Sequence, residues 1–190
     1  MVHLLLYKET KKNGIFAIIK CINIVNRFVM PKSMETIDSI ILSDYILKHY
    51  GPMSHLKLQR LLFYCDAYHL ACFDKELIDD SFEAWVHGPI SRKVYGSLKD
   101  KYMLYEELTY SNNTKEDVDK KFAKLTQDQR NFIRYILKEL STWTMFELGA
   151  SIRNEKPWKE ARIGYGEADK CHVEISKETT RLFYKKDLIQ

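Results

Sequence analysis

The sequence predicts a mainly α-helical fold, a single helical domain of about six helices with a small β-hairpin or short strand element before a Gly-Pro turn. Apolar residues recur at helical spacing in several segments, and two capping boxes mark helix starts. One short stretch, 82–86, alternates as a strand does. With 190 residues, 45% hydrophobic, the chain is long enough for one domain with a core. It contains no internal repeat and no Pro/Gly-rich linker.

The first helix is expected over 35–49. Ile37, Ile40, Ile41 and Leu47 lie on one face at helical spacing. Ser33 is placed to cap this helix, and Gly51-Pro52 ends it.

The second helix is expected over 55–72, with Ser54 as its cap. Its main apolar stripe follows the i, i+3, i+4, i+7 pattern and consists of Leu58, Leu61, Leu62, Cys65, Tyr68 and Cys72. Leu56, Phe63 and Leu70 add apolar surface on further sides. Because it is apolar on several sides, we expect this helix to be central.

The next segments change character. Residues 77–81 are polar and turn-forming, the strand at 82–86 follows, and Gly88-Pro89 ends it. Ser91 then starts a helix that carries Val94, Tyr95 and Leu98. Residues 108–121 are polar and are predicted to form a loop.

The C-terminal part has the clearest helix starts. Thr126 with Gln129, and Thr144 with Glu147, each fit a capping box, which predicts helices over 126–141 and 144–153. Pro157 suits the first turn of a short helix to Arg162, and Gly164-Tyr165-Gly166 breaks the pattern. Ser176 is placed to cap a last helix.

Charge divides the chain into two parts. Residues 1–32 carry six basic and one acidic residue, a net +5, which leaves 24 basic and 25 acidic residues, or −1, in residues 33–190. The body therefore lacks the basic excess typical of a nucleic-acid binder. The apolar runs at 15–19 and 22–25 are too short to span a membrane. We expect 1–32 to be a dispensable extension or the product of an upstream start codon; a basic amphipathic segment that contacts a membrane or a partner is the alternative.

The sequence contains no pattern typical of a catalytic or metal site. The six histidines form no HExxH or HxxxH pair, and the four cysteines form no CxxC pair. No G-x-S-x-G or glycine-rich phosphate loop is present. We therefore expect no enzyme activity, cofactor, metal or small-molecule substrate, and we interpret the cysteines as free thiols of a cytoplasmic protein.

The helices at 126–141 and 144–153 also fit the spacing of a helix-turn-helix. The second of them offers Arg153 as its basic residue, with Glu147 opposing it. A recognition helix needs basic and polar groups that enter a DNA groove, so we favour an ordinary helical hairpin. DNA-binding regulation remains an alternative function.

Three short motifs follow one another along the chain. The first lies in the second helix, the next combines a tryptophan, a Gly-Pro pair and a downstream tyrosine, and the last is a Pro-Trp pair before a basic helix. Their residues are Lys57, Leu58, Leu61, Leu62 and Tyr64, then Trp85, Gly88, Pro89 and Tyr95, then Pro157 and Trp158. Together they resemble the motifs of the Panacea domain, the family of SocA-like antitoxins and phage-associated GepA-like proteins. They occur in family order, and the resemblance covers about residues 35–186.

The resemblance implies that 33–190 is a Panacea-like helical domain and that the protein is an antitoxin. It would neutralise, by direct binding, a cognate toxin encoded by a neighbouring gene, often in a prophage. One branch of the family instead acts as a proteolytic adaptor that delivers its toxin to the ClpXP protease. From physical reasoning, Trp85 and Trp158 are expected to anchor the packing, Gly88 to permit a tight turn, and Tyr95 to contact Trp85. With Leu61 and Leu62, the three aromatic residues are expected to be largely buried.

Overall fold

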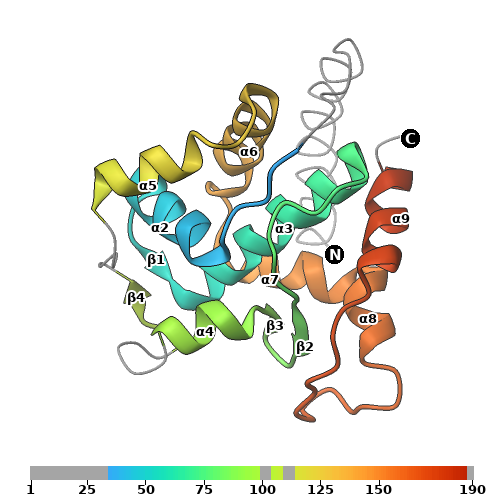
Figure 1. Cartoon of the computed structure of the whole chain (residues 1–190). Helices are drawn as coiled ribbons and strands as arrows, with labels where there is room; N and C mark the ends of the chain where they lie inside the picture. Colours follow the sequence, from blue (N-terminus) through green and yellow to red (C-terminus); the bar gives the residue numbers. More distant parts are fainter. Residues whose placement is uncertain (1–33, 99–103, 109–113, 188–190) are drawn as a thin grey trace.

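The computed structural model describes residues 34–98, 104–108 and 114–187, which form eight helices and two small antiparallel sheets (Figure 1). The helices are α2 (Ser39–Tyr50), α3 (His55–Phe73), α4 (Arg92–Leu98), α5 (Lys115–Phe122), α6 (Gln127–Leu140), α7 (Met145–Asn154), α8 (Lys156–Ala161) and α9 (Lys177–Asp187). One sheet pairs β1 (Met53–Ser54) with β4 (Glu107–Leu108), and the other pairs β2 (Glu83–Trp85) with β3 (Gly88–Ile90). The mainly helical prediction is confirmed, while the expected extension 1–32 lies outside the described residues.

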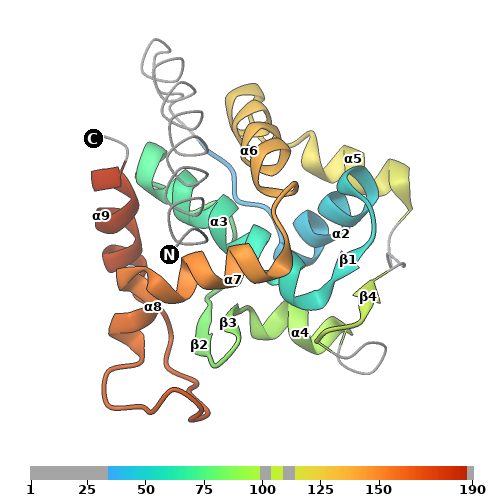
Figure 2. The same cartoon turned by 180° about the vertical axis from the view of Figure 1, so that it is seen from behind.

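Helix α3 is the centre of the molecule, as its apolar sides predict. All of its residues except Lys57 and Cys72 are buried. It contacts α2, α6, α7, α9 and strand β3, and Figures 1 and 2 show these elements arranged around it. The four longest of the other helices, α2, α6, α7 and α9, therefore all pack against α3.

The capping predictions hold at three of the four best-marked starts. The Ser54 side chain accepts a hydrogen bond from the Lys57 amide, and the boxes at Thr126 and Thr144 are both complete. Helix α2 differs, because it begins at Ser39 and is capped by Asp38. The chain just before it is extended, with the Ile37 amide donating to the Leu77 carbonyl over 2.8 Å, so the helix cannot start earlier. Ser33, the expected cap, lies outside the described residues.

The segment around Gly88-Pro89 also differs from the prediction. These two residues are not the turn that ends a strand; they open the returning strand β3 of a hairpin, and the turn is Val86-His87. Gly88 lies opposite Trp85 with φ +118°, a backbone conformation that favours glycine. Any other residue at position 88 would therefore strain the backbone where the hairpin closes.

The predicted loop over 108–121 is wrong in part. Strand β4 ends at Leu108, and Thr114 caps helix α5, whose Val118 and Phe122 are buried. The Phe122 ring stacks on Tyr45 of α2 with the ring centroids 3.7 Å apart. Two apolar residues four positions apart are enough to dock a short polar helix, which is why composition alone suggested a loop. Residues 109–113 lie outside the described part of the chain.

Candidate functional site

The residues of the first motif divide between core and surface. Leu58, Leu61 and Leu62 are fully buried in the core. Lys57 is half-buried at the start of α3, and its ammonium donates to the Ser141 carbonyl over 2.7 Å. Burial lowers the pKa of Lys57, and the charge of Glu147 opposes that shift. Lys57 thus ties α3 to the connection between α6 and α7.

Tyr64 belongs to a buried polar cluster around Glu155. The Tyr64 hydroxyl donates to Glu155 over 3.2 Å, Ser151 donates over 3.1 Å, and Tyr184 also donates to this carboxylate. Burial is the main cause that raises the pKa of Tyr184, with the Glu155 charge second. The cluster joins α3, α7 and α9 just before the buried Pro157 that opens α8.

The hairpin β2–β3 is held by side chains from α3 and from α8 and its C-cap. Trp158 donates from its indole nitrogen to the Trp85 carbonyl over 3.1 Å, and Arg162 donates to the Ala84 carbonyl over 2.9 Å. On the other side, Gln59 of α3 accepts from the Ser91 amide over 2.9 Å and donates to the Ser91 carbonyl over 3.3 Å. The second and third motifs are therefore brought into direct contact, which their separation in sequence does not reveal.

Three of the five side chains expected to be largely buried are only partly so. Trp85, Tyr95 and Trp158 are partly exposed, in contrast to Leu61 and Leu62. The Trp85 ring contacts the rings of Tyr95, at 5.1 Å between centroids, and His172, at 5.5 Å. The expected contact between Tyr95 and Trp85 is present. Trp85 is partly exposed and is not part of the hydrophobic core, so with Tyr95 and His172 it forms an aromatic cluster at the surface.

Glu83 organises the polar edge of this aromatic surface. Its carboxylate accepts from the Trp85 indole over 2.8 Å, lies 3.1 Å from the imidazole of His172, and pairs with Arg92. Burial is the largest single influence on the pKa of Glu83 and raises it. The hydrogen bonds from Arg92, Trp85 and His172 together lower it by more, so the pKa of Glu83 lies below its usual value. Glu83 is therefore a carboxylate that is already fully engaged.

Arg60 is the residue of the site that sequence reasoning missed. It is only 4% exposed, and it donates to the carbonyl oxygens of His87, in the hairpin turn, and Met145, in the first turn of α7. Its guanidinium lies between two glycines: a Cβ at Gly88 would lie 3.4 Å from its Nε, and one at Gly149 would lie 2.7 Å from its central carbon. Arg60 thus joins α3, the hairpin and α7.

The charge of Arg60 is not balanced within the described residues. It has no ion pair there, and its Nε is one of two buried side-chain nitrogens without a hydrogen-bond acceptor, the other being His55 Nδ1. Burial, followed by repulsion from Arg153, lowers the pKa of Arg60 to about 10, so it is charged at neutral pH. The signal in the sequence was an arginine between Leu58 and Leu61 on an apolar helix, since an arginine is rarely buried without a partner.

The surface above Arg60 is aromatic and basic. We define the α7–hairpin face as Tyr105, His87, Phe146 and Arg153 at the surface, with Arg60 beneath them. Phe146 is 76% exposed and Tyr105 58% exposed, and the Tyr105 ring lies 5.5 Å from that of His87. Burial, then the charges of Arg60 and Arg153, lowers the pKa of His87 below its usual 6.5. The composition, aromatic side chains with arginine, is typical of protein-binding surfaces.

The described residues contain no group of three or more His, Cys, Asp or Glu side chains arranged to hold a metal ion. No helix in that part of the chain is both long enough and apolar enough to cross a membrane. The geometry of this site is thus built from packing, backbone hydrogen bonds and a buried cation.

One comparison with known proteins gives a match. The family model described as antitoxin SocA-like, Panacea domain, matches residues 58–159, which is just over half of the chain and runs from α3 into α8. The matched part is shorter than the expected 35–186, and it contains the hairpin, Arg60, Gly149 and the α7–hairpin face. No curated protein and no solved structure matches the chain.

Proposed function

The chain belongs to the family of SocA-like antitoxins with a Panacea domain, and we propose that it neutralises a cognate toxin by binding it directly. The observation that carries this proposal is the family match over residues 58–159. The expected partner is a toxin protein encoded by a neighbouring gene.

The surface of the molecule supports a binding function. The matched region exposes aromatic side chains together with arginines, the residue types that dominate binding energy at protein interfaces. The polar groups near the hairpin, by contrast, are engaged in holding secondary-structure elements together, as Gln59, Glu83 and Arg162 illustrate. A catalytic site needs polar groups that converge on a substrate rather than on the backbone. We therefore expect binding without turnover.

Growth of cells that express the neighbouring gene tests the proposal. Expression of that gene alone should arrest growth, and co-expression of this chain should restore it. The matched control is a chain with Leu61→Asp, which places a carboxylate in the fully buried core and should abolish both folding and rescue. Toxicity that persists in the presence of the intact, soluble chain would contradict the proposal.

Delivery of the toxin to ClpXP is the alternative mechanism within the same family. The two mechanisms differ in what happens to the toxin: direct masking leaves its amount unchanged, whereas delivery removes it. Rescue should therefore persist in cells that lack the protease if masking is the mechanism, and it should disappear if delivery is. Either mechanism implies a cytoplasmic protein, which agrees with the free thiols of Cys65 and Cys171.

A further inference from the structure

The buried charge of Arg60 lacks a counter-ion within the chain as described. Moving a guanidinium out of water is costly unless a carboxylate or a set of acceptors compensates it, and two backbone carbonyls satisfy only part of its five donors. Besides burial, the residues that influence the pKa of Arg60 are Arg153, Tyr105 and Tyr64, and none of these carries a carboxylate. The fold therefore retains a positive charge just beneath the surface.

Arg153 places a second positive charge near the first. It is exposed on α7, it has no ion pair among the residues described, and it lies close enough to lower the pKa of both Arg60 and His87. Two neighbouring positive charges repel each other, which destabilises the free protein. A negative charge from outside would relieve this repulsion.

An exposed aromatic residue lies on the same face of α7. Phe146 and Arg153 are two helical turns apart, so their side chains point in the same direction, and Gly149 between them faces Arg60. The Tyr105 hydroxyl lies 3.2 Å from the imidazole of His87 in the hairpin turn. The face thus combines two arginines with two exposed aromatic residues.

We propose that the toxin binds the α7–hairpin face through an acidic segment, with an Asp or Glu carboxylate on Arg153 above the buried Arg60 and apolar neighbours against Phe146 and Tyr105. The inference rests on the proposed function and names the surface and the chemistry of its partner. Charge complementarity selects the occupant, because the five residues of the face include two arginines and no carboxylate. Aromatic side chains with Arg at the centre of the contact are typical of the residues that dominate binding.

Binding of the purified product of the neighbouring gene to single-residue variants tests this inference. Arg153→Glu should weaken the affinity at least about tenfold, mostly by slower association, because it converts attraction into repulsion at an exposed charge. The salt dependence of association should fall with it. Phe146→Ser should weaken the affinity by a similar factor through faster dissociation.

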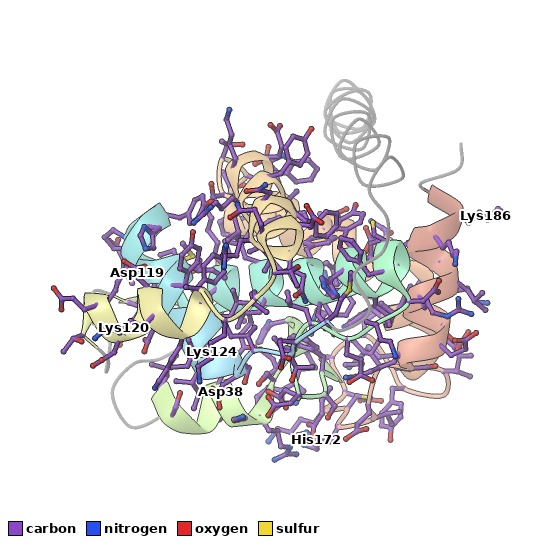
Figure 3. All side chains as sticks on the ribbon, turned by 45° about the horizontal axis from the view of Figure 1, so that its top comes forward. Asp38, Asp119, Lys120, Lys124, His172 and Lys186 are labelled. Carbon is purple, nitrogen blue, oxygen red and sulfur yellow. The ribbon has the colours of Figure 1, made fainter. Side chains whose placement is uncertain are left out.

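Two matched controls share the chemistry of these changes and differ only in position. Lys120→Glu makes the same change of charge on α5, which Figure 3 shows well away from His172 beside the hairpin. Ile163→Ser removes an apolar side chain, 77% exposed, that lines an open groove between α8 and α9 with Phe183. Both variants should bind as the unaltered chain does, and circular dichroism should show that all four variants are folded.

Three outcomes would overturn the inference. Undiminished binding by Arg153→Glu and Phe146→Ser would place the interface elsewhere while leaving the antitoxin function intact, and a loss confined to Ile163→Ser would move it to the α8–α9 groove. Loss of duplex-DNA binding in Arg153→Glu, with no binding of the neighbouring gene product by the unaltered chain, would contradict the proposed function and this inference together.

Discussion

Two buried histidines make the folded state sensitive to acid. His55 and His69 are fully buried, and burial lowers the pKa of each from 6.5 to about 4. His69 is positioned between the Lys75 carbonyl, 2.7 Å from Nδ1, and the Gln129 amide, 3.0 Å from Nε2, which fixes the neutral ring with its proton on Nδ1. Because the unfolded chain binds protons at these residues before the folded chain does, stability is fully present above pH 6.5 and falls as the pH drops toward 4.

We predict that the free energy of unfolding decreases between pH 6.5 and pH 4, by on the order of 3 kcal/mol for each of the two histidines. Asp66 acts in the opposite direction, since burial raises its pKa to about 6 and protonation then favours the folded state, but one carboxyl does not offset two imidazoles. Urea unfolding at several pH values measures how the free energy of unfolding depends on pH. His55→Phe should weaken this dependence. A free energy of unfolding that stays constant between pH 6.5 and pH 4 would contradict the lowered pKa values of the two histidines.

The leucines of α3 should matter more to stability than Trp85. Leu61 is fully buried, so Leu61→Ala should reduce the free energy of unfolding by about 2–5 kcal/mol. Trp85 is partly exposed, and the bond from Trp158 goes to its backbone carbonyl, which Trp85→Ala leaves in place. Its loss should therefore cost less than the loss of Leu61. Chemical denaturation of the two variants gives the ranking, and a larger effect at Trp85 would restore the interpretation of this residue as a core anchor.

At the scale of elements, α7 and the hairpin are joined to α3 through Arg60, and glycine makes the contact possible. We predict that Gly149→Ala destabilises the protein by about 1–3 kcal/mol, because its new Cβ would lie 2.7 Å from the Arg60 guanidinium carbon and displace it from both carbonyls.

Gly96 on α4 is the matched control, since a Cβ there meets nothing within 4 Å and its φ is not positive. Gly96→Ala should stabilise the helix by about 0.5–1 kcal/mol, as alanine does in a helix interior. Thermal unfolding of the two variants should thus shift in opposite directions. Equal shifts would show that Arg60 moves freely and does not join these elements.

The elements that sequence predicted well carry strong local signals. The helices beginning at Ser54, Thr126 and Thr144 have side-chain caps that act within one turn, so their starts depend on nearby residues alone. Helix α5 and the start of α2 depend on distant partners instead: Phe122 on Tyr45, and Ile37 on Leu77. Local patterns do not contain such information, which explains both errors.

At the scale of the whole molecule, the same distinction applies to the candidate site. The Trp85, Gly88-Pro89 and Pro157-Trp158 motifs marked the segments that become the hairpin and α8, but not the hydrogen bond by which Trp158 holds the Trp85 carbonyl. The α7–hairpin face could not be predicted in this way, because its residues come from four segments that only the fold brings together. The buried Arg60, which lies among them, was recognisable as unusual, but its partners were not.

The central claim is that this chain acts by forming a complex with the product of the neighbouring gene. The most direct test is to co-express the two proteins, purify them through a tag on this chain, and determine the molar mass of the eluted species by light scattering. We predict a single species that contains both proteins in a fixed ratio and persists on dilution. The account would be contradicted if co-expression restored growth while the two purified proteins eluted separately, each at its own mass.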